Sequence, residues 1–328
     1  MKKLCFRIIV LAVLVMMASL SGISSASAYP TGPIRFIIPF APGGGSDVFV
    51  RALAPHLGRE MGTTFVVENL EGAGTQIGLT ALLNAPADGY TIAQANQPHT
   101  GFTVAVQGAG YTEADFAWLN MQHIDPPSIT VLPGKPWQDF QELLDYIKAN
   151  PGEVAFGTTQ MSGGHVFLFY IQDKFDLDFI IVPYSGGGES RAALLGGHVD
   201  VIIGNAFADY SLRDQVRAIG IGSDVRSPLW PEAPTFYEAT GNRELAELAR
   251  SLSSVRGVVV SRVFKENYPE RFEKLVEAYY RAFHSDEHMV DAERTGQIPI
   301  MVWTGPEEAE RLAAAASYVI AEFAPFFR

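Results

Sequence analysis

Cysteine and positive charge are scarce in this 328-residue sequence. Its one cysteine is Cys5, and 24 Lys and Arg stand against 36 Asp and Glu, which gives a formal net charge of −12. A chain with one thiol forms no internal disulfide and no zinc site built from several cysteines. An acidic chain is also poorly suited to nucleic acids and anionic membrane surfaces, which attract positive charge. Any acidic ligand must therefore be attracted by local dipoles rather than by the overall field.

Hydrophobic runs of membrane-spanning length are absent as well. The apolar stretch Ile8–Leu20 has only 13 residues, three basic residues precede it, and Ala26-Ser27-Ala28 follows it as an A-x-A site. This order is typical of a cleaved secretory signal peptide, with an uncleaved N-terminal anchor as the alternative. We predict a signal peptide over residues 1–28, cleavage after Ala28 and a periplasmic mature protein. Cleavage would remove Cys5 and three positive charges, which takes the formal charge from −12 to −15.

One pattern occurs twice: an apolar run, a glycine-rich turn and then a helical pattern. The first copy is Ile34–Phe40 followed by Gly43-Gly44-Gly45-Ser46-Asp47, and the second is Phe179–Pro183 followed by Ser185-Gly186-Gly187-Gly188-Glu189. A glycine-rich turn that opens a helix presents free backbone N–H groups, and the helix dipole favours negative charge there. Neither turn has the G-x-G-x-x-G spacing or the G-K-[ST] ending of a nucleotide site. The pair predicts two lobes that each offer an anion-binding turn to a shared cleft.

Short apolar segments alternate with helical patterns, which predicts an α/β fold with two lobes and mostly parallel sheets. We expect strands at Ile34–Phe40, Thr64–Glu68, Tyr90–Ala93, Ser128–Leu132, Val154–Gly157, Phe179–Val182, Val199–Ile203 and Arg217–Ile221. We expect helices at Ser46–Met61, Gly78–Asn84, Trp137–Asn150, Gly164–Lys174, Ser190–Leu195, Glu244–Ser251, Pro269–His284 and Pro306–Phe323. Pro55 should kink or end the first helix near Ala54. We assign residues 29–126 to lobe 1, 127–224 to lobe 2, and 225–328 to the return to lobe 1 and the C-terminal helices.

Ordered motifs along nearly the whole mature chain resemble one family. They are YPTGPIRFIIPFAPGGGSD, VVENLEGAGTQIG, NAPADGYTI, VAFGTTQMSGGH, IVPYSGGGESRAALLGGHVDV, VRAIGIGSDVRSP and TGPEEAERLAAA. Together they resemble the solute receptors of tripartite tricarboxylate transporters, often called Bug proteins. The resemblance implies a two-lobed periplasmic binding protein of the type II, Venus-flytrap kind. Such a protein captures a small carboxylate between its lobes and delivers it to a membrane permease, without a cofactor, a metal or catalysis.

The resemblance also implies where the ligand binds: in the loop after the first strand, in the glycine-rich loops of the second lobe, and after the third strand. The residues predicted to bind the ligand are Pro42, Gly43, Gly44, Gly45, Ser46, Asp47, Gln97, Thr158, Thr159, Ser162, Gly163, His165, Ser185, Gly186, Gly187 and Asn205. We assign Asp47 to holding its loop or an ordered water, and His165 to a hydrogen bond at the helix start. Phe40 is expected in the core.

No Arg or Lys lies within these loops. We therefore expect recognition by backbone amides, hydroxyls and bridging water rather than by an arginine clamp. The chain departs from the family at Leu70-Glu71, where Arg-Pro is common, and at Gly204-Asn205, where Asp-Asn is common. The identity of the ligand therefore stays open: dicarboxylates, tricarboxylates, amino acids and aromatic acids are all candidates.

Two other functions compete with solute delivery. In the first, the closed receptor contacts a signalling membrane protein instead of a permease. In the second, His284, Glu287 and His288 form the H-x-x-E-H pattern of a zinc-dependent hydrolase, with both histidines on one helix face. A solvated surface is the favoured interpretation of that polar stretch. The G-x-S-x-G elbow of serine hydrolases does not occur.

Overall fold

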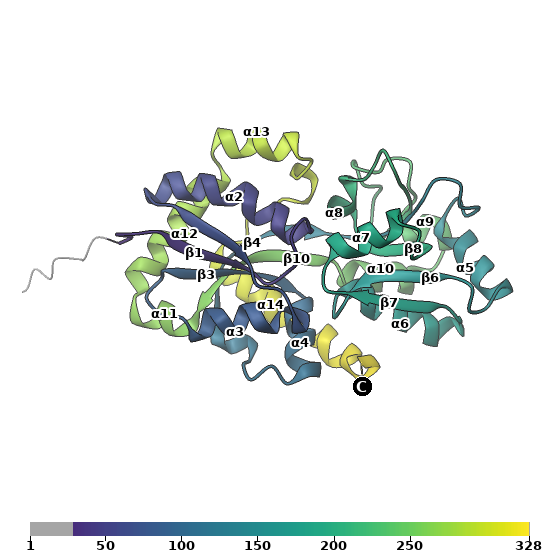
Figure 1. Cartoon of the computed structure of the whole chain (residues 1–328), viewed down its shortest axis with the longest axis horizontal. Helices are drawn as coiled ribbons and strands as arrows, with labels where there is room; N and C mark the ends of the chain where they lie inside the picture. Colours follow the sequence, from purple (N-terminus) through teal and green to yellow (C-terminus); the bar gives the residue numbers. More distant parts are fainter. Residues whose placement is uncertain (1–28, 328) are drawn as a thin grey trace, which may run out of the picture. The chain divides into compact units, whose positions relative to one another are not determined.

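A computed structural model describes residues 29–327 of the chain (Figure 1). It divides into two compact units, the first ending at Thr31 and the second beginning at Gly32. The predicted signal peptide and its cleavage site lie outside the described residues. None of the helices that the structure describes combines the length and apolar composition of a membrane span. The unit that begins at Gly32 contains two five-stranded sheets.

The first sheet has the strand order β2-β1-β3-β10-β4. Its strands are β1 (Ile34–Ile38), β2 (Phe65–Asn69), β3 (Thr91–Gln97), β4 (Phe116–Asp125) and β10 (Ser254–Ser261). Strand β1 runs parallel to β2 and β3, whereas β10 runs antiparallel to β3 and β4.

Helices cover both faces of the first sheet (Figure 1). One face carries α2 (Gly45–Met61), α12 (Pro269–Phe283) and α13 (Asp286–Arg294), and the other carries α3 (Gln76–Asn84), α4 (His99–Gln107) and α14 (Gly305–Phe323). The short helix α11 (Arg262–Asn267) follows β10 directly.

The second sheet has the strand order β7-β6-β8-β5-β9. Its strands are β5 (Pro127–Val131), β6 (Ala155–Thr159), β7 (Ile180–Tyr184), β8 (Val201–Asn205) and β9 (Arg217–Ile221). Strand β6 is parallel to β7 and β8, and β5 is antiparallel to β8 and β9. Its helices are α5 (Phe140–Ala149), α6 (Gly163–Phe175), α7 (Gly187–Leu195), α8 (Ala206–Tyr210), α9 (Phe236–Thr240) and α10 (Arg243–Ser251).

The chain passes between the two sheets at two places. The first is the link from β4 to β5 at Pro126, and the second is the segment between α10 and β10. Before the second passage, α9 and α10 pack on the second sheet, where Phe236 and Leu245 share a core cluster with Phe140. The chain therefore returns to the first sheet at β10. The predicted two-lobed α/β fold is confirmed, and the lobe boundaries at residues 126 and 224 stay a prediction.

Three local expectations need correction. Pro55 does not end α2, which continues to Met61 and stops at Gly62, a residue with a φ of 66°. Leu53 and Leu57 on either side of Pro55 are fully buried, so packing outweighs the one lost backbone hydrogen bond. Strands β4 and β10 were not predicted. Strand β10 is central in the first sheet and β4 lies at its edge, and both bury polar side chains among the apolar ones, which hides the pattern of a strand.

Candidate functional site

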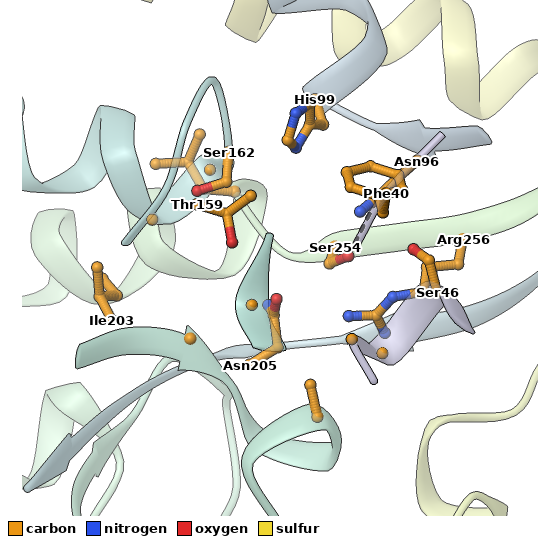
Figure 2. A pocket seen from close by; sticks show the side chains of 18 of the residues that line it. Phe40, Ser46, Asn96, His99, Thr159, Ser162, Ile203, Asn205, Ser254 and Arg256 are labelled. Carbon is orange, nitrogen blue, oxygen red and sulfur yellow. Dashed lines mark hydrogen bonds between the residues drawn. The ribbon is translucent and has the colours of Figure 1, made fainter. Parts of the chain in front are cut away.

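The N-termini of three helices from both sheets line one cavity of about 60 Å³. Helix α2 contributes Gly45 and Ser46, α6 contributes Gly163 and Gly164, and α7 contributes Gly187. Figure 2 shows the side chains of Ser46, Ser254 and Arg256 on one side of the cavity and those of Thr159 and Ser162 across from them. Free N–H groups and the positive ends of three helix dipoles thus meet in one small space.

A carboxylate behind the cavity holds the first glycine-rich loop. Asp47 Oδ2 accepts a 3.0 Å hydrogen bond from the Gly43 N–H, and Oδ1 accepts from Arg51 Nε at 2.8 Å and Asn69 Nδ2 at 3.0 Å. Gly43 has a φ of 76°, a left-handed conformation that favours glycine. Asp47 itself does not line the cavity, in agreement with its expected role in holding the loop.

The start of α6 is fixed by its N-cap residue. Ser162 Oγ accepts a hydrogen bond of 3.1 Å from the His165 N–H, which is the ordinary N-cap arrangement. The His165 ring accepts from the Met161 N–H and packs against Phe169 and Phe327. Burial lowers the pKa of His165 to about 4, so its ring is neutral near pH 7. His165 therefore supports the helix start and does not line the cavity.

The structure brings most, but not all, of the predicted site residues to the cavity wall. Those that line it are Gly44, Gly45, Ser46, Gln97, Thr159, Ser162, Gly163, Gly187 and Asn205. Those outside the lining are Pro42, Gly43, Asp47, Thr158, His165, Ser185 and Gly186. Each residue of the second group lies within two positions of a lining residue in the sequence. Phe40, expected in the core, is buried but also lines the cavity.

Two arginines from outside the glycine-rich loops also line the cavity and were not among the predicted site residues. Recognition by backbone amides, hydroxyls and bridging water stays a prediction. Arg191 lies on α7, one turn after Gly187, and Arg256 lies in the middle of β10. The side chain of a helical residue leans toward the helix N-terminus, so the spacing of Gly187 and Arg191 is a signal that could have revealed Arg191. Arg256 gives no such signal, since it lies in a strand that was not predicted.

Each arginine has a buried acidic partner that does not line the cavity. Arg191 Nη1 lies 3.6 Å from Asp209 Oδ1, and Arg256 Nη1 donates a 2.8 Å hydrogen bond to Asp125 Oδ2. Burial raises the pKa of Asp209 to about 6, although the Arg191 charge and a hydrogen bond from Ser128 oppose this. Burial likewise raises the pKa of Asp125, against the charge of Arg256 and the backbone N–H of Phe207.

The remaining titratable side chain of the lining is His99. Burial lowers its pKa to about 3, so the ring is neutral, and its edge meets the Phe40 ring with centroids 4.9 Å apart. Among the described residues, the cavity wall therefore contains two guanidinium groups and no carboxylate. Such a wall is complementary to a small anion.

The expectation that His284 and His288 share one helix face is wrong. His284 is the C-cap residue of α12, and His288 belongs to α13, which begins after the N-cap residue Ser285. Ser285 Oγ accepts from the His288 N–H and so starts a new helix between the two histidines. Across the part of the chain that the structure describes, no group of three or more His, Cys, Asp or Glu is placed to hold a metal ion.

Comparison with known proteins gives the family. Residues 49–249 match the model of the tripartite tricarboxylate transporter family receptor. The protein BugT of Bordetella pertussis is 32% identical over 235 residues, which cover 70% of this chain and 72% of BugT.

Solved structures agree on the fold. The periplasmic binding protein BugD superposes with a TM-score of 0.79 at 23% identity, over 90% of this chain and 97% of BugD. MatC of Rhodopseudomonas palustris with bound malate gives 0.78 at 21%, over 92% of this chain and all of MatC. The fold is thus that of two-lobed periplasmic binding proteins. By the family match and the similarity to BugT, the chain belongs to the tripartite tricarboxylate transporter family of solute-binding receptors.

Proposed function

We propose that this protein is a periplasmic receptor that captures a small carboxylate in the cavity between its two sheets and delivers it to a tripartite tricarboxylate-type permease. The observation that carries the proposal is the cavity wall: three helix N-termini, two guanidinium groups and no carboxylate. The acidic chain as a whole repels anions, so an anionic ligand must be attracted by the local positive potential of this cavity. The malate bound to MatC supports a carboxylate as the ligand class.

The donors suggest how the acid is held. The N–H groups at the starts of α2, α6 and α7 and the hydroxyls of Ser46 and Thr159 all border a cavity with room for only a small molecule. Donors to an ionised acceptor contribute about 1.5–3 kcal/mol each, so a few of them account for micromolar binding.

We propose no catalysis at this site. Among the described residues, the hydroxyls that line the cavity make no hydrogen bond to a histidine ring that would activate them as nucleophiles. Ser162 Oγ is the N-cap acceptor of α6, and Ser254 Oγ donates to Asn96 Oδ1 at 2.9 Å.

Capture would involve closure of the two lobes about the passages at Pro126 and before β10. A ligand shifts an open–closed balance only by its differential affinity for the two states. A carboxylate that contacts helix N-termini from both sheets makes all of its contacts only in the closed state. Its affinity for the closed state is therefore higher than for the open state.

A thermal-shift screen tests ligand capture. At 100 times its dissociation constant, a bound acid adds about 2.7 kcal/mol to the free energy of unfolding. We expect at least one small carboxylate to raise the melting temperature and its uncharged amide analogue to leave it unchanged. No shift with any small carboxylate would contradict the proposed ligand class.

Uptake of the identified acid tests delivery. Loss of uptake in a strain that lacks the receptor, restored by the wild-type gene, supports the permease as partner. Unchanged uptake would favour the alternative in which the closed receptor contacts a signalling protein.

A further inference from the structure

A second pocket lies between α14 and the passage that joins α10 to β10. Its volume of about 240 Å³ exceeds the roughly 150 Å³ of an engineered apolar cavity that binds benzene. Most of its wall is apolar: Met121 comes from β4, Val255 from β10, and Leu312 and Val319 from α14. The pocket is therefore suited to an apolar group of about the size of an aromatic ring.

The passage separates this pocket from the ligand cavity. Figure 2 shows Ser254 and Arg256 at the ligand cavity, whose wall they form. Their neighbours Ser253 and Val255 line the pocket instead. Side chains of an extended chain alternate between its two faces, which explains this division. The passage is thus one chain thick, with the ligand cavity on one face and the apolar pocket on the other.

Polar groups of the pocket wall are few. The hydroxyl groups of Ser251 and Ser253 donate to backbone carbonyl groups of α10, at 2.7 Å and 2.6 Å. Among the described residues, the wall contains no charged side chain. An ionic occupant would lose its hydration without gaining a partner, so the pocket favours an uncharged molecule.

Gln97 is the exception, because it offers an acceptor that nothing satisfies. It lies at the end of β3, lines both the pocket and the ligand cavity, and is 2% exposed. Its Nε2 donates a 2.8 Å hydrogen bond to Glu113 Oε2, whereas its Oε1 has no hydrogen-bond partner among the described residues. A buried acceptor without a partner is unfavourable, so an occupant that donates a hydrogen bond to it gains affinity.

Two small residues of α14 make the pocket accessible. Ala315 and Ala316 both lie on its wall, and Ala315 is exposed to solvent. A longer side chain at either position would occupy space that is now empty. A small molecule can therefore enter from the surface beside α14.

We infer that this pocket binds a small uncharged aromatic molecule with one hydrogen-bond donor, and that the occupant strengthens ligand binding in the cavity across the passage. The Met121 thioether favours an aromatic ring, and Gln97 Oε1 accepts from the donor. The ring packs against the passage and so holds Ser254 and Arg256 in the positions that line the ligand cavity. This coupling rests on the proposed function, whereas binding in the pocket does not.

Crystals of the mature protein soaked in 4-bromophenol test the site, because anomalous scattering from bromine identifies the position of the probe. We expect a bromine peak between α14 and residues 251–255 without any carboxylate present. A peak only at other positions, or no peak at saturating probe, would overturn the inference whatever the ligand cavity binds.

Calorimetric titration with phenol and toluene tests the hydrogen-bond donor. Toluene is the more apolar of the two, and the phenol hydroxyl loses its water when it enters the pocket. We expect phenol to bind at least as tightly as toluene, since Gln97 Oε1 replaces that water. Weaker binding of phenol than of toluene would overturn the role of Gln97.

Two matched variants locate the probe in the pocket. Ala316→Leu fills part of the pocket and should weaken phenol binding at least about tenfold. Ala314→Leu makes the same change at an exposed residue of α14 outside the pocket wall, and should leave phenol binding unchanged. Equal affinities in two variants with normal melting curves would overturn the assignment of the pocket.

Titration of the carboxylate identified by thermal shift, with and without saturating phenol, tests the coupling. We expect phenol to raise the affinity for the carboxylate at least about fivefold, and the carboxylate to raise the affinity for phenol by the same factor. Unchanged carboxylate affinity with phenol in the pocket would overturn the coupling. A protein that binds phenol in the pocket but no small carboxylate would contradict the proposed function and leave the pocket assigned.

Discussion

Arg191 and Gly43 lie 148 positions apart in the sequence, yet Arg191 Nη2 donates a 2.6 Å hydrogen bond to the Gly43 carbonyl oxygen. Arg191 belongs to a helix of the second sheet, and Gly43 to the loop that follows β1 of the first sheet. The contact therefore joins the two lobes at the edge of the cavity. In the proposed mechanism of capture, this contact helps to hold the two lobes together around the ligand.

Removing this contact should weaken ligand binding without unfolding either lobe. We expect Arg191→Gln with Asp209→Asn, which leaves no unpaired buried charge, to lower ligand affinity about tenfold, because a charge-assisted hydrogen bond of the closed state is lost. Calorimetry measures the affinity, and X-ray scattering measures compaction on binding. Arg250→Gln, at an exposed arginine paired with Asp224, is the control. Unchanged affinity and compaction in the double variant would show that the contact does not contribute to closure.

Gly187→Pro tests the backbone amide at the start of α7. Position 187 is the first residue of the helix, where proline is tolerated, and Gly186 before it is extended, as proline requires of its neighbour. The substitution thus removes an N–H with little strain. We expect ligand affinity to fall at least about tenfold and the melting temperature without ligand to change little.

Gly187→Ala is the matched control, since it keeps the N–H group. Its Cβ would stand 3.2 Å from Arg191 Nη1, at the flexible end of that side chain, and 3.8 Å from Thr159 Oγ1, an ordinary van der Waals contact. Equal affinity for the proline and alanine variants would show that the α7 amide does not contact the ligand.

Loss of the Asp47 carboxylate should disorder the first glycine-rich loop. Asp47→Ala removes the acceptor for the Gly43 N–H, for Arg51 and for Asn69. We expect a loss of about 1–3 kcal/mol in the free energy of unfolding and weaker ligand binding, since a loop that must be ordered costs affinity. Denaturant titration measures the first and calorimetry the second. A variant with normal stability and normal affinity would contradict the role of Asp47 in holding the loop.

The neutral state of His99 predicts a pH dependence of stability. Its folded pKa of about 3 lies below the usual value of 6.5, so the unfolded chain takes up a proton first as the pH falls. The contribution of His99 is complete above pH 6.5 and is lost as the pH falls toward 3. It should be smaller by about 2 kcal/mol at pH 5 than at pH 7.5. His99→Gln should remove this part of the dependence, so a wild-type minus variant difference that is flat with pH would contradict the assignment.

The helix starts of the cavity were predictable from the sequence, and the spacing of Gly187 and Arg191 made Arg191 predictable too, whereas Arg256 was not. Glycine-rich turns before the helical patterns indicated the starts of α2 and α7. Glycine is common where a turn packs closely against another chain segment, and a run of glycines is visible in the local sequence. Arg256 depends on Asp125, 131 positions away, and on a glycine at position 45. Pairings of that kind exist only in the folded protein. In the same way, the single N-cap residue Ser285 separated two histidines that helical spacing alone had placed on one face.

The most direct test of the account is a crystal structure of the mature protein with the carboxylate that gives the largest thermal shift. We predict the acid inside the cavity, with its oxygens within hydrogen-bond distance of backbone N–H groups at the starts of α2, α6 or α7 and of the Arg256 guanidinium. A carboxylate bound outside this cavity, or bound within it through none of these donors, would contradict the account.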